Sequence, residues 1–441
     1  MVSVADARAK AETLQDGLVK RFFRATEIDV RLLSMVIAML IIWAGFDLFG
    51  IATGQSTLFT DPRNLWNLTV QTATIAIMAT GMTLVIVMRQ IDLSVGSMLS
   101  FVAVVSGVAQ VYWLAPTLGS DHPAIWVIAV AIAIGLGALL GAFNGFLIAY
   151  AGIPAFIVTL GGLIGYSGAA WLVARGETVA PMDGRFELIG GNTQGSWLGD
   201  TWSIAIGALA CLAIVGGLVA NRASRRRFQF PQRPMWAEWF LGVAGCAIVA
   251  AVVWIVNAYR WPPMVAKRYA EAHGIPIPPG GIDFGHGFAL PVVLVLIVGA
   301  TMTFMATRTR FGRYVYAMGG NPEAAELAGV NTKRLTVAMF SLMGALVGLA
   351  ACVSAARLDA ASNDLGQFDE LYVIAATVIG GTSLAGGLGT IYGAMVGALV
   401  MQSLQSGMTL LNIDSAVKDI VVGVVLVLAV WLDQQFRRGK A

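Results

Sequence analysis

Uninterrupted apolar segments recur along the whole chain and are separated by short polar connections. Most are long enough to cross the hydrocarbon core of a bilayer as a helix, for which about 20 residues suffice. We predict twelve segments, at residues 33–50, 65–88, 97–113, 125–150, 153–174, 202–220, 239–257, 288–306, 335–355, 371–384, 390–411 and 417–432. The segment at 371–384 is short and ends in glycines, so a broken helix is an alternative there and 10–12 full spans fit the pattern. The predicted fold class is an all-α, polytopic membrane helix bundle.

Composition agrees with this prediction, because hydrophobic residues make up 57% and charged residues 12% of the chain. Soluble domains average roughly 45–50% apolar and 25% charged residues. The three cysteines lie inside apolar segments, at spacings that give neither a disulfide framework nor a metal site. His122, His273 and His286 lie in predicted outer loops without a spaced partner, and we expect them to be solvated. We therefore expect neither a metal nor another cofactor.

The basic residues give the bundle a direction across the membrane. If the N-terminus is cytoplasmic, 20 of the 28 Lys and Arg residues fall on the inner side, as the positive-inside rule requires. The C-terminus is then cytoplasmic as well. This predicts a cytoplasmic segment at 1–31, a transmembrane domain at 32–433 with a basic cytoplasmic loop at 308–334, and a tail at 434–441.

Several kinds of chemistry have no residues to support them. A chain that hydrolyses ATP needs a glycine-rich loop that ends in Gly-Lys-Ser/Thr, and the single Gly-Lys pair here is Gly439-Lys440. The motifs of zinc peptidases and serine hydrolases are also absent from the sequence, so we expect no catalytic residue. No clear charge lies deep in a predicted span, which disfavours an ion-coupled carrier.

A short capped helix is predicted in the basic loop, at 321–329. Asn321 is a good N-cap, Pro322 suits the first helical position, Glu323 complements the helix dipole, and Gly329 can end the helix in a left-handed conformation. Its small side chains suit docking into a groove of another protein, although a linker helix would have the same pattern. The residues of this candidate docking helix are Gly320, Asn321, Pro322, Glu323, Ala324, Ala325 and Gly329.

Polar residues at span ends and in broken spans are candidates for lining a path across the membrane. Asp92 or Ser94 can cap the helix that follows them, with Arg89 paired to Asp92, so an interfacial turn is an equal alternative there. Hydroxyl groups in the glycine-rich segment 379–389 could contact a polyol, or the segment could be a tight turn. The candidate path residues are Asp92, Ser94, Asn144, Thr159, Thr382 and Ser383.

Small residues spaced four apart predict where helices pack closely. They fall on three predicted spans, as Gly137, Gly141 and Gly145, as Gly344 and Gly348, and as Gly393 and Gly397.

Four ordered motifs resemble those of the permease subunits of bacterial monosaccharide ABC importers, the group of the ribose, galactoside and xylose permeases. They are IDLSVGS at 91–97, IPAFIVTLGG at 153–162, TRTRFGR at 307–313 leading into GGN at 319–321, and VIGGTSLAGG at 378–387. The resemblance covers roughly 60–433. Gln90 departs from the pattern, because many members have glycine there. Residues 202–257 look like an additional helical hairpin, which makes the xylose permeases the closest type.

The resemblance implies a multi-pass protein of the bacterial inner membrane that imports D-xylose or a related monosaccharide. It also implies a second permease copy, cytoplasmic ABC ATPase subunits and a periplasmic sugar-binding protein as partners. In such a family the helix at 321–329 is similar to the coupling helix that fits a groove of the ATPase. The alternative function is an autonomous secondary carrier or facilitator for a small polar solute.

Overall fold

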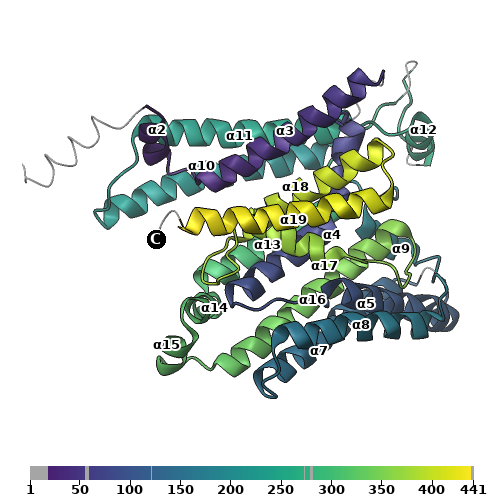
Figure 1. Cartoon of the computed structure of the whole chain (residues 1–441). Coiled ribbons are helices and arrows are strands. Elements are labelled where there is room, and N and C mark those ends of the chain that lie inside the picture. Colours follow the sequence, from purple (N-terminus) through teal and green to yellow (C-terminus); the bar gives the residue numbers. More distant parts are fainter. Residues whose placement is uncertain (1–17, 55–58, 121, 273, 279–281, 439–441) are drawn as a thin grey trace, which may run out of the picture. The chain divides into compact units, whose positions relative to one another are not determined.

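The computed structural model describes residues 18–54, 59–120, 122–272, 274–278 and 282–438, and these residues are helical apart from turns and isolated bridges (Figure 1). Expectations for residues 1–17, His273 and residues 439–441 lie outside the described residues. The elements are α2 (Leu18–Thr26), α3 (Val30–Ala52), α4 (Pro62–Val87), α5 (Val95–Val108), π-helix η1 (Ala109–Leu114), α6 (Ala115–Leu118), α7 (Ala124–Ala149), α8 (Ala155–Ala174), α9 (Gly184–Glu187), 3-10 helix η2 (Leu188–Gly190), α10 (Gly199–Arg227), α11 (Met235–Ala258), α12 (Pro263–Ala272), α13 (Leu290–Arg308), α14 (Arg310–Gly320), α15 (Pro322–Leu327), α16 (Thr332–Leu358), α17 (Asp369–Ile379), α18 (Ile391–Leu410) and α19 (Ser415–Arg438).

Within the described ranges, nine helices are long and apolar enough to cross a membrane. Eight of them are α3, α4, α7, α8, α10, α11, α13 and α16. The ninth is the continuous helix formed by α5, η1 and α6. The all-helical membrane fold is therefore confirmed. The predicted segment at 371–384 forms α17, which has 11 residues and ends at Ile379, too short for a span of about 20 residues. Helices α17, α18 and α19 are not among these nine, so their crossing of the membrane remains a prediction.

The chain divides into two compact units. Unit 1 consists of Met1–Ile37 and Leu198–Phe288, and unit 2 consists of Ala38–Trp197 and Ala289–Ala441. In unit 1, α10 and α11 run alongside each other as a hairpin, within the range where the sequence resemblance suggested one (Figure 1).

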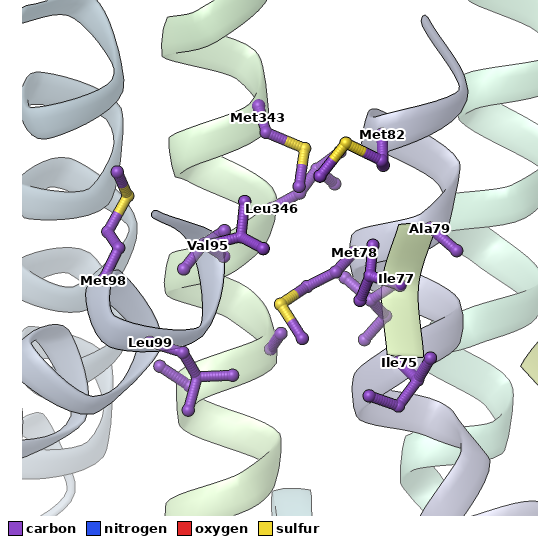
Figure 2. Packing of buried hydrophobic residues seen from close by; sticks show 14 of the residues in the cluster. Ile75, Ile77, Met78, Ala79, Met82, Val95, Met98, Leu99, Met343 and Leu346 are labelled. Carbon is purple, nitrogen blue, oxygen red and sulfur yellow. The ribbon is translucent and has the colours of Figure 1, made fainter. Parts of the chain in front are cut away.

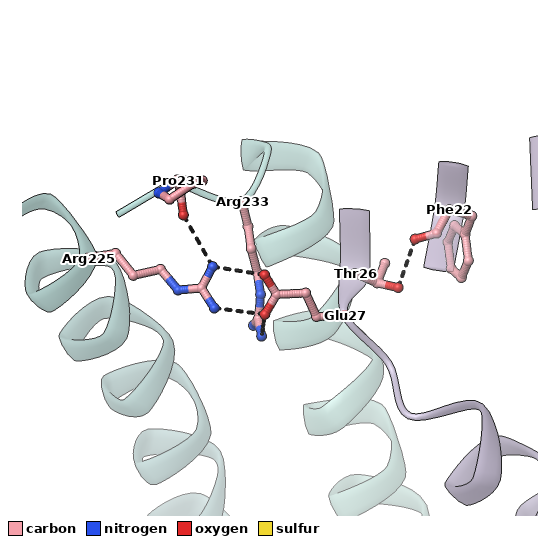
Figure 3. Close-up of polar contacts among 6 residues, drawn as sticks. All are labelled: Phe22, Thr26, Glu27, Arg225, Pro231 and Arg233. Carbon is pink, nitrogen blue, oxygen red and sulfur yellow. Dashed lines mark hydrogen bonds and ion pairs between the residues drawn. The ribbon is translucent and has the colours of Figure 1, made fainter. Parts of the chain in front are cut away.

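Unit 1 fixes its N-terminal helix through ion pairs. Glu27, directly after α2, accepts hydrogen bonds of 2.7–2.8 Å from both terminal nitrogens of Arg225, and Arg233 donates to the same carboxylate at 2.7 Å (Figure 3). These hydrogen bonds lower the pKa of Glu27 to about 2. Arg225 belongs to α10 and Arg233 precedes α11, so a single carboxylate connects α2 to the polar end of the hairpin.

The opposite end of the hairpin contains an aromatic pair. His286 is 2% exposed, and its ring stacks on that of Tyr259 with centroids 3.9 Å apart. The expectation that this histidine is solvated is wrong, because the aromatic ring supplies a packing partner that the loop sequence does not reveal. Burial lowers the pKa of His286 to about 4, so the ring is neutral near pH 7.

Unit 2 is built around α4, which is almost completely buried. Figure 2 shows side chains of α4 such as Met78 and Met82 packed towards Met343 and Leu346 of α16, with Leu99 of α5 nearby. A span with apolar residues all round is typical of a helix buried in the centre of a bundle. Figure 1 shows α5, α7, α8 and α16 side by side in this unit.

The predicted close-packing faces are confirmed in unit 2. A Cβ added at Gly344 of α16 would lie 2.8 Å from the carbonyl carbon of Gly137 and 3.1 Å from the Cα of Gly141, both on α7. On α18, Gly393 and Gly397 face the backbone of α17 in the same way. Small residues therefore let these backbones touch directly.

Candidate functional site

Helix α15 has the caps that the sequence predicts. The Asn321 side chain accepts a hydrogen bond from the backbone N–H of Ala324 at 3.0 Å, and Pro322 is the first helical residue. After the helix, Gly329 has a φ of +86°, in the left-handed region that favours glycine. These predictions are confirmed.

The C-terminal end of α15 exposes an apolar side chain. Glu323 and Ala324 are exposed, whereas Ala325 is 5% exposed and faces the rest of unit 2. Leu327 is 90% exposed. A single exposed apolar side chain is common on protein surfaces, but on a short capped helix it offers an anchor that a groove of a partner protein can bind.

The base of α15 is fixed to the end of α4 by one arginine. Arg89 donates hydrogen bonds from Nε to the Gly319 carbonyl at 2.8 Å and from Nη2 to the Gly320 carbonyl at 2.6 Å. The predicted pairing of Arg89 with Asp92 is therefore wrong. Arg89 has a φ of +63°, and its guanidinium satisfies the terminal carbonyl groups of α14, which no intrahelical donor can reach.

The glycine-rich turn between α17 and α18 meets the same place. The Gly387 N–H donates to the Val87 carbonyl at 2.9 Å, and the Tyr316 hydroxyl donates to the Gly389 carbonyl at 2.7 Å. The helix end that precedes α15, the end of α4 and the α17–α18 turn are thus joined by hydrogen bonds. These bonds connect α14, which directly precedes α15, to the end of α4 and to the turn after α17.

Four of the six predicted path residues come together in one buried hydrogen-bonded cluster. Asp92 Oδ1 accepts from the backbone N–H of Ser94 at 2.9 Å and from its hydroxyl at 2.6 Å. Asn144 donates to the Ser94 hydroxyl at 3.1 Å and accepts from the Tyr166 hydroxyl at 2.7 Å. The Thr159 hydroxyl lies 3.4 Å from the carbonyl of Ile91 in the same segment. We call Asp92, Ser94, Asn144, Thr159 and Tyr166 the Asp92 cluster.

The Asp92 cluster corrects one capping detail. Ser94 is the N-cap residue of α5, but its side chain makes no cap hydrogen bond; its hydroxyl donates to Asp92 and accepts from the Asn144 amide. The second oxygen of Asp92, Oδ2, is buried and has no hydrogen-bond partner in the described part of the chain. A carboxyl in such a position is costly unless a further group satisfies it.

The remaining two path residues lie in the turn that follows α17. The Thr382 N–H donates to the Thr377 carbonyl at 3.1 Å, and the Ser383 N–H donates to the Leu388 carbonyl at 2.8 Å. Both side chains are at most 1% exposed. They lie in the same turn as Gly389, whose carbonyl accepts the hydrogen bond from the Tyr316 hydroxyl.

A polar cavity of about 250 Å³ lies between α4, α16, α17 and α18, and the sequence analysis missed it. We call it the polar cavity. Its lining residues are Gln71, Thr74, Ile75, Ser354, Arg357, Leu365, Gly366, Asp369, Gln402, Gln405 and Thr409. The sequence signal is three glutamines inside apolar segments, which are uncharged and therefore do not stand out as a charge inside a membrane span does.

Two hydrogen bonds organise the amides of the polar cavity. Gln402 Nε2 donates to Gln71 Oε1 at 3.1 Å, which joins α18 to α4, and Gln405 Nε2 lies 3.4 Å from the Tyr372 hydroxyl of α17. Arg357, in the last turn of α16, keeps a buried Nε with no hydrogen-bond partner among the described residues. Asp369 is the first residue of α17, after Phe368 with a φ of +66°. Such a lining can bind a polar solute.

A bundle of membrane-spanning helices with a polar cavity and an exposed capped helix defines the chain as a membrane transport protein. The family described as branched-chain amino acid transport system / permease component matches residues 64–430. The chain therefore belongs to this permease family and is the permease component of a transport system, not itself an enzyme.

Curated relatives agree with this assignment. The chain is 38% identical over 376 residues to the xylose transport system permease protein XylH of Escherichia coli K12, covering 85% of this chain and 86% of the relative. It is 35% identical over 412 residues to the XylH of Haemophilus influenzae, covering 93% and 98%. It is 31% identical over 388 residues to the ribose import permease protein RbsC of Escherichia coli K12, covering 88% and 91%. No solved structure matches the chain significantly.

Proposed function

We propose that the chain is the membrane-spanning subunit of an ATP-driven importer for D-xylose or a related monosaccharide. It passes sugar from a periplasmic binding protein to the cytoplasm, and separate ATPase subunits supply the energy. The observation that carries the proposal is the 38% identity with a permease named for xylose transport, over 86% of that relative. The relatives named for ribose import are less similar, at 31%.

In this proposal the protein is a multi-pass component of the bacterial inner membrane with both termini in the cytoplasm. The basic residues of the 308–334 loop and of the α10–α11 connection support this orientation through the positive-inside rule. Helices α17, α18 and α19 complete the twelve predicted segments.

Helix α15 is the docking element for the ATPase. Its exposed Leu327 and Glu323 offer an apolar anchor and a charge on one short, capped helix. Movement of the ATPases reaches α4 through Arg89 and reaches α17 through Tyr316 and Gly387. The permease then responds to ATP hydrolysis that takes place on another chain.

Substitution of the exposed leucine tests this docking. Leu327→Glu should abolish co-purification of the ATPase while the permease still assembles in the membrane. The matched control is Leu358→Glu, which changes a half-exposed leucine at the other end of α16. Retention of the ATPase by the Leu327 variant, or its equal loss from the control, would refute the assignment of α15.

Reconstitution tests the function as a whole. Vesicles that contain the permease, its ATPase and its binding protein should take up xylose only with ATP, and ribose and leucine should compete weakly. Xylose uptake by the permease alone, without ATP, would establish the secondary carrier instead. Uptake of leucine would instead identify the cargo as a branched-chain amino acid, as in the family description.

A second copy of the chain fits against α8. Gly161, Gly165 and Gly168 are exposed on this helix, and a Cβ at any of them would meet no atom within 4 Å. Glycines three or four apart on an open helix face allow close approach of another helix. Gly165→Leu should therefore lower the dimer fraction measured by cross-linking, whereas Gly135→Leu on α7, equally unobstructed, should not.

The Asp92 cluster and the Thr382–Ser383 turn form the cytoplasmic end of the path in this proposal. The support is their nearness along the chain to Arg89 and to Gly387, which contact the base of α15. Asn144→Leu removes both hydrogen bonds of that amide and should slow uptake while ATPase binding persists. Unchanged uptake would remove the Asp92 cluster from the path.

A further inference from the structure

The polar cavity has a lining whose chemistry suits one kind of cargo. Gln71, Gln402 and Gln405 each present an amide, which has two donors and an acceptor oxygen. Their hydrogen bonds use one donor of Gln402, one donor of Gln405 and the acceptor oxygen of Gln71, so each amide retains hydrogen-bonding capacity. Donors and acceptors that alternate over a small surface match the hydroxyl groups of a sugar ring.

Two charged groups complete the lining and oppose each other in sign. Arg357 comes from the end of α16, and Asp369 comes from the start of α17. Because the two formal charges cancel, the cavity does not select for an ion. The buried Nε of Arg357, which lacks a partner, offers a donor that a ligand hydroxyl can satisfy.

The apolar part of the lining is small. Ile75 and Leu365 supply the aliphatic side chains among the lining residues. A branched aliphatic side chain needs an extensive apolar pocket to leave water favourably. The volume of about 250 Å³ lies just below the roughly 300–1,000 Å³ of pockets for drug-sized ligands. The cavity therefore suits a single sugar ring better than an amino acid with a branched aliphatic side chain or a disaccharide.

The position of the polar cavity fits a place where cargo enters. Arg357 lies 25 residues after Thr332 along α16, and at about 1.5 Å per residue this separates the two ends by about 38 Å. Helix α15 directly precedes the Thr332 end, so the cavity lies towards the other end of the helix. Arg89, which follows α4, bonds to the last carbonyl groups before α15, and the turn after α17 bonds to Val87 of α4 and to Tyr316 of α14.

We propose that the polar cavity binds one neutral monosaccharide as it is released from the binding protein, with Gln71, Gln402, Arg357 and Asp369 as its main hydrogen-bonding groups. This rests on the proposed function, because it names where the imported sugar is first held. ATP-driven movement at α15 then acts on α4 and α17 and changes the shape of the site. ATP-driven movement at the α15 end of the bundle is thereby coupled to sugar binding at the other end.

Ligand protection tests binding directly. In a chain with all three native cysteines replaced by alanine, Ser354→Cys places a thiol in the cavity lining. A polar maleimide should label it in the purified complex, and millimolar xylose should slow the labelling at least several-fold. The matched control is Ser362→Cys, which lies outside the lining and should be labelled at the same rate with or without xylose. Protection by leucine instead of xylose, or no protection, would overturn the proposal.

Uptake kinetics provide a second and independent test. Gln402→Leu should reduce xylose uptake per ATP hydrolysed by about tenfold, the effect of one or two lost hydrogen bonds. ATPase co-purification should be retained, which a folding defect would not allow. Gln367→Leu, at an exposed residue close to Asp369 but outside the lining, should behave like the wild type.

The outcomes separate the two proposals. If the wild-type complex shows no ATP-dependent xylose uptake, the proposed function fails. If the wild type imports xylose and Gln402→Leu and Asp369→Asn import it equally well, the cavity proposal fails and the function stands. Loss of uptake in the Asn144 variant alone would then place sugar binding at the Asp92 cluster.

Discussion

Replacing Gly344 by alanine should destabilise unit 2 by forcing α16 away from α7. The added methyl group would lie 2.8 Å from the carbonyl carbon of Gly137 and 3.1 Å from the Cα of Gly141, and closer still to the Gly137 carbonyl oxygen. These are backbone atoms, so no side-chain rotation can relieve the contact and the helices must separate. Overpacking of this kind costs about 1–3 kcal/mol, and we expect the upper part of that range.

Gly135→Ala is the matched control for this prediction. Gly135 lies on α7, two residues before Gly137, and an added methyl group there would meet no atom within 4 Å. Alanine also favours a helix over glycine by up to about 1 kcal/mol, so the control should be neutral or slightly stabilised. The two variants should therefore differ by about 2–4 kcal/mol in free energy of unfolding.

Unfolding in mixed micelles at increasing SDS fraction, followed by tryptophan fluorescence, measures this difference. The double variant Gly141→Ala/Gly344→Ala should lose less than the sum of its single variants, because one separation of the helices relieves both contacts. A Gly344 variant as stable as the wild type would refute the close approach of α7 and α16. Equal damage from Gly135→Ala would show that any added methyl group on these helices is harmful, which would remove the basis of the argument.

Three further predictions concern the polar connections. Asn321→Ala should lose about 1 kcal/mol of helix stability at α15 and weaken ATPase co-purification, whereas Asn321→Asp keeps a capping oxygen and should retain it. Glu27→Gln should speed hydrogen exchange in α2, while Glu271→Gln, which changes an exposed pair, should not. The Glu27 pKa is lower in the folded protein than its ordinary value of 4.5, so protection of α2 should be complete at neutral pH and fall as the pH drops from 4.5 towards 2. Protection that instead falls on raising the pH would contradict the ion pairs with Arg225 and Arg233.

The sequence predicted most of what depends on local pattern. The apolar segments gave the spans because a membrane helix must satisfy its own backbone over a fixed length. The glycines four apart identified faces of α7, α16 and α18 where backbones touch, since only small residues allow this, but they did not reveal which helix lies opposite. Asn321, Pro322 and Gly329 defined α15 because caps act within a few residues of the chain.

Features that depend on distant segments were not accessible in the same way. Arg89 bonds to carbonyl groups 230 residues away, and a pairing with nearby Asp92 had the same local pattern. Gln71 and Gln402 are 331 residues apart and each looks like an isolated polar residue in an apolar span. The sequence shows that such a glutamine needs a partner, but the tertiary fold decides that the partner is another glutamine beside a cavity.

The packing of α4 explains how a bundle this tight can still transmit movement. Its middle is surrounded by apolar side chains such as Met78 and Met82, which adapt to small shifts because they are flexible and make no hydrogen bonds (Figure 2). Its two halves differ, because Gln71 in the first half lines the polar cavity, whereas Val87 at the end and Arg89 bond to the turn after α17 and to the end of α14. In the proposed mechanism, a tilt of α4 driven from α15 would change the distance between Gln71 and Gln402.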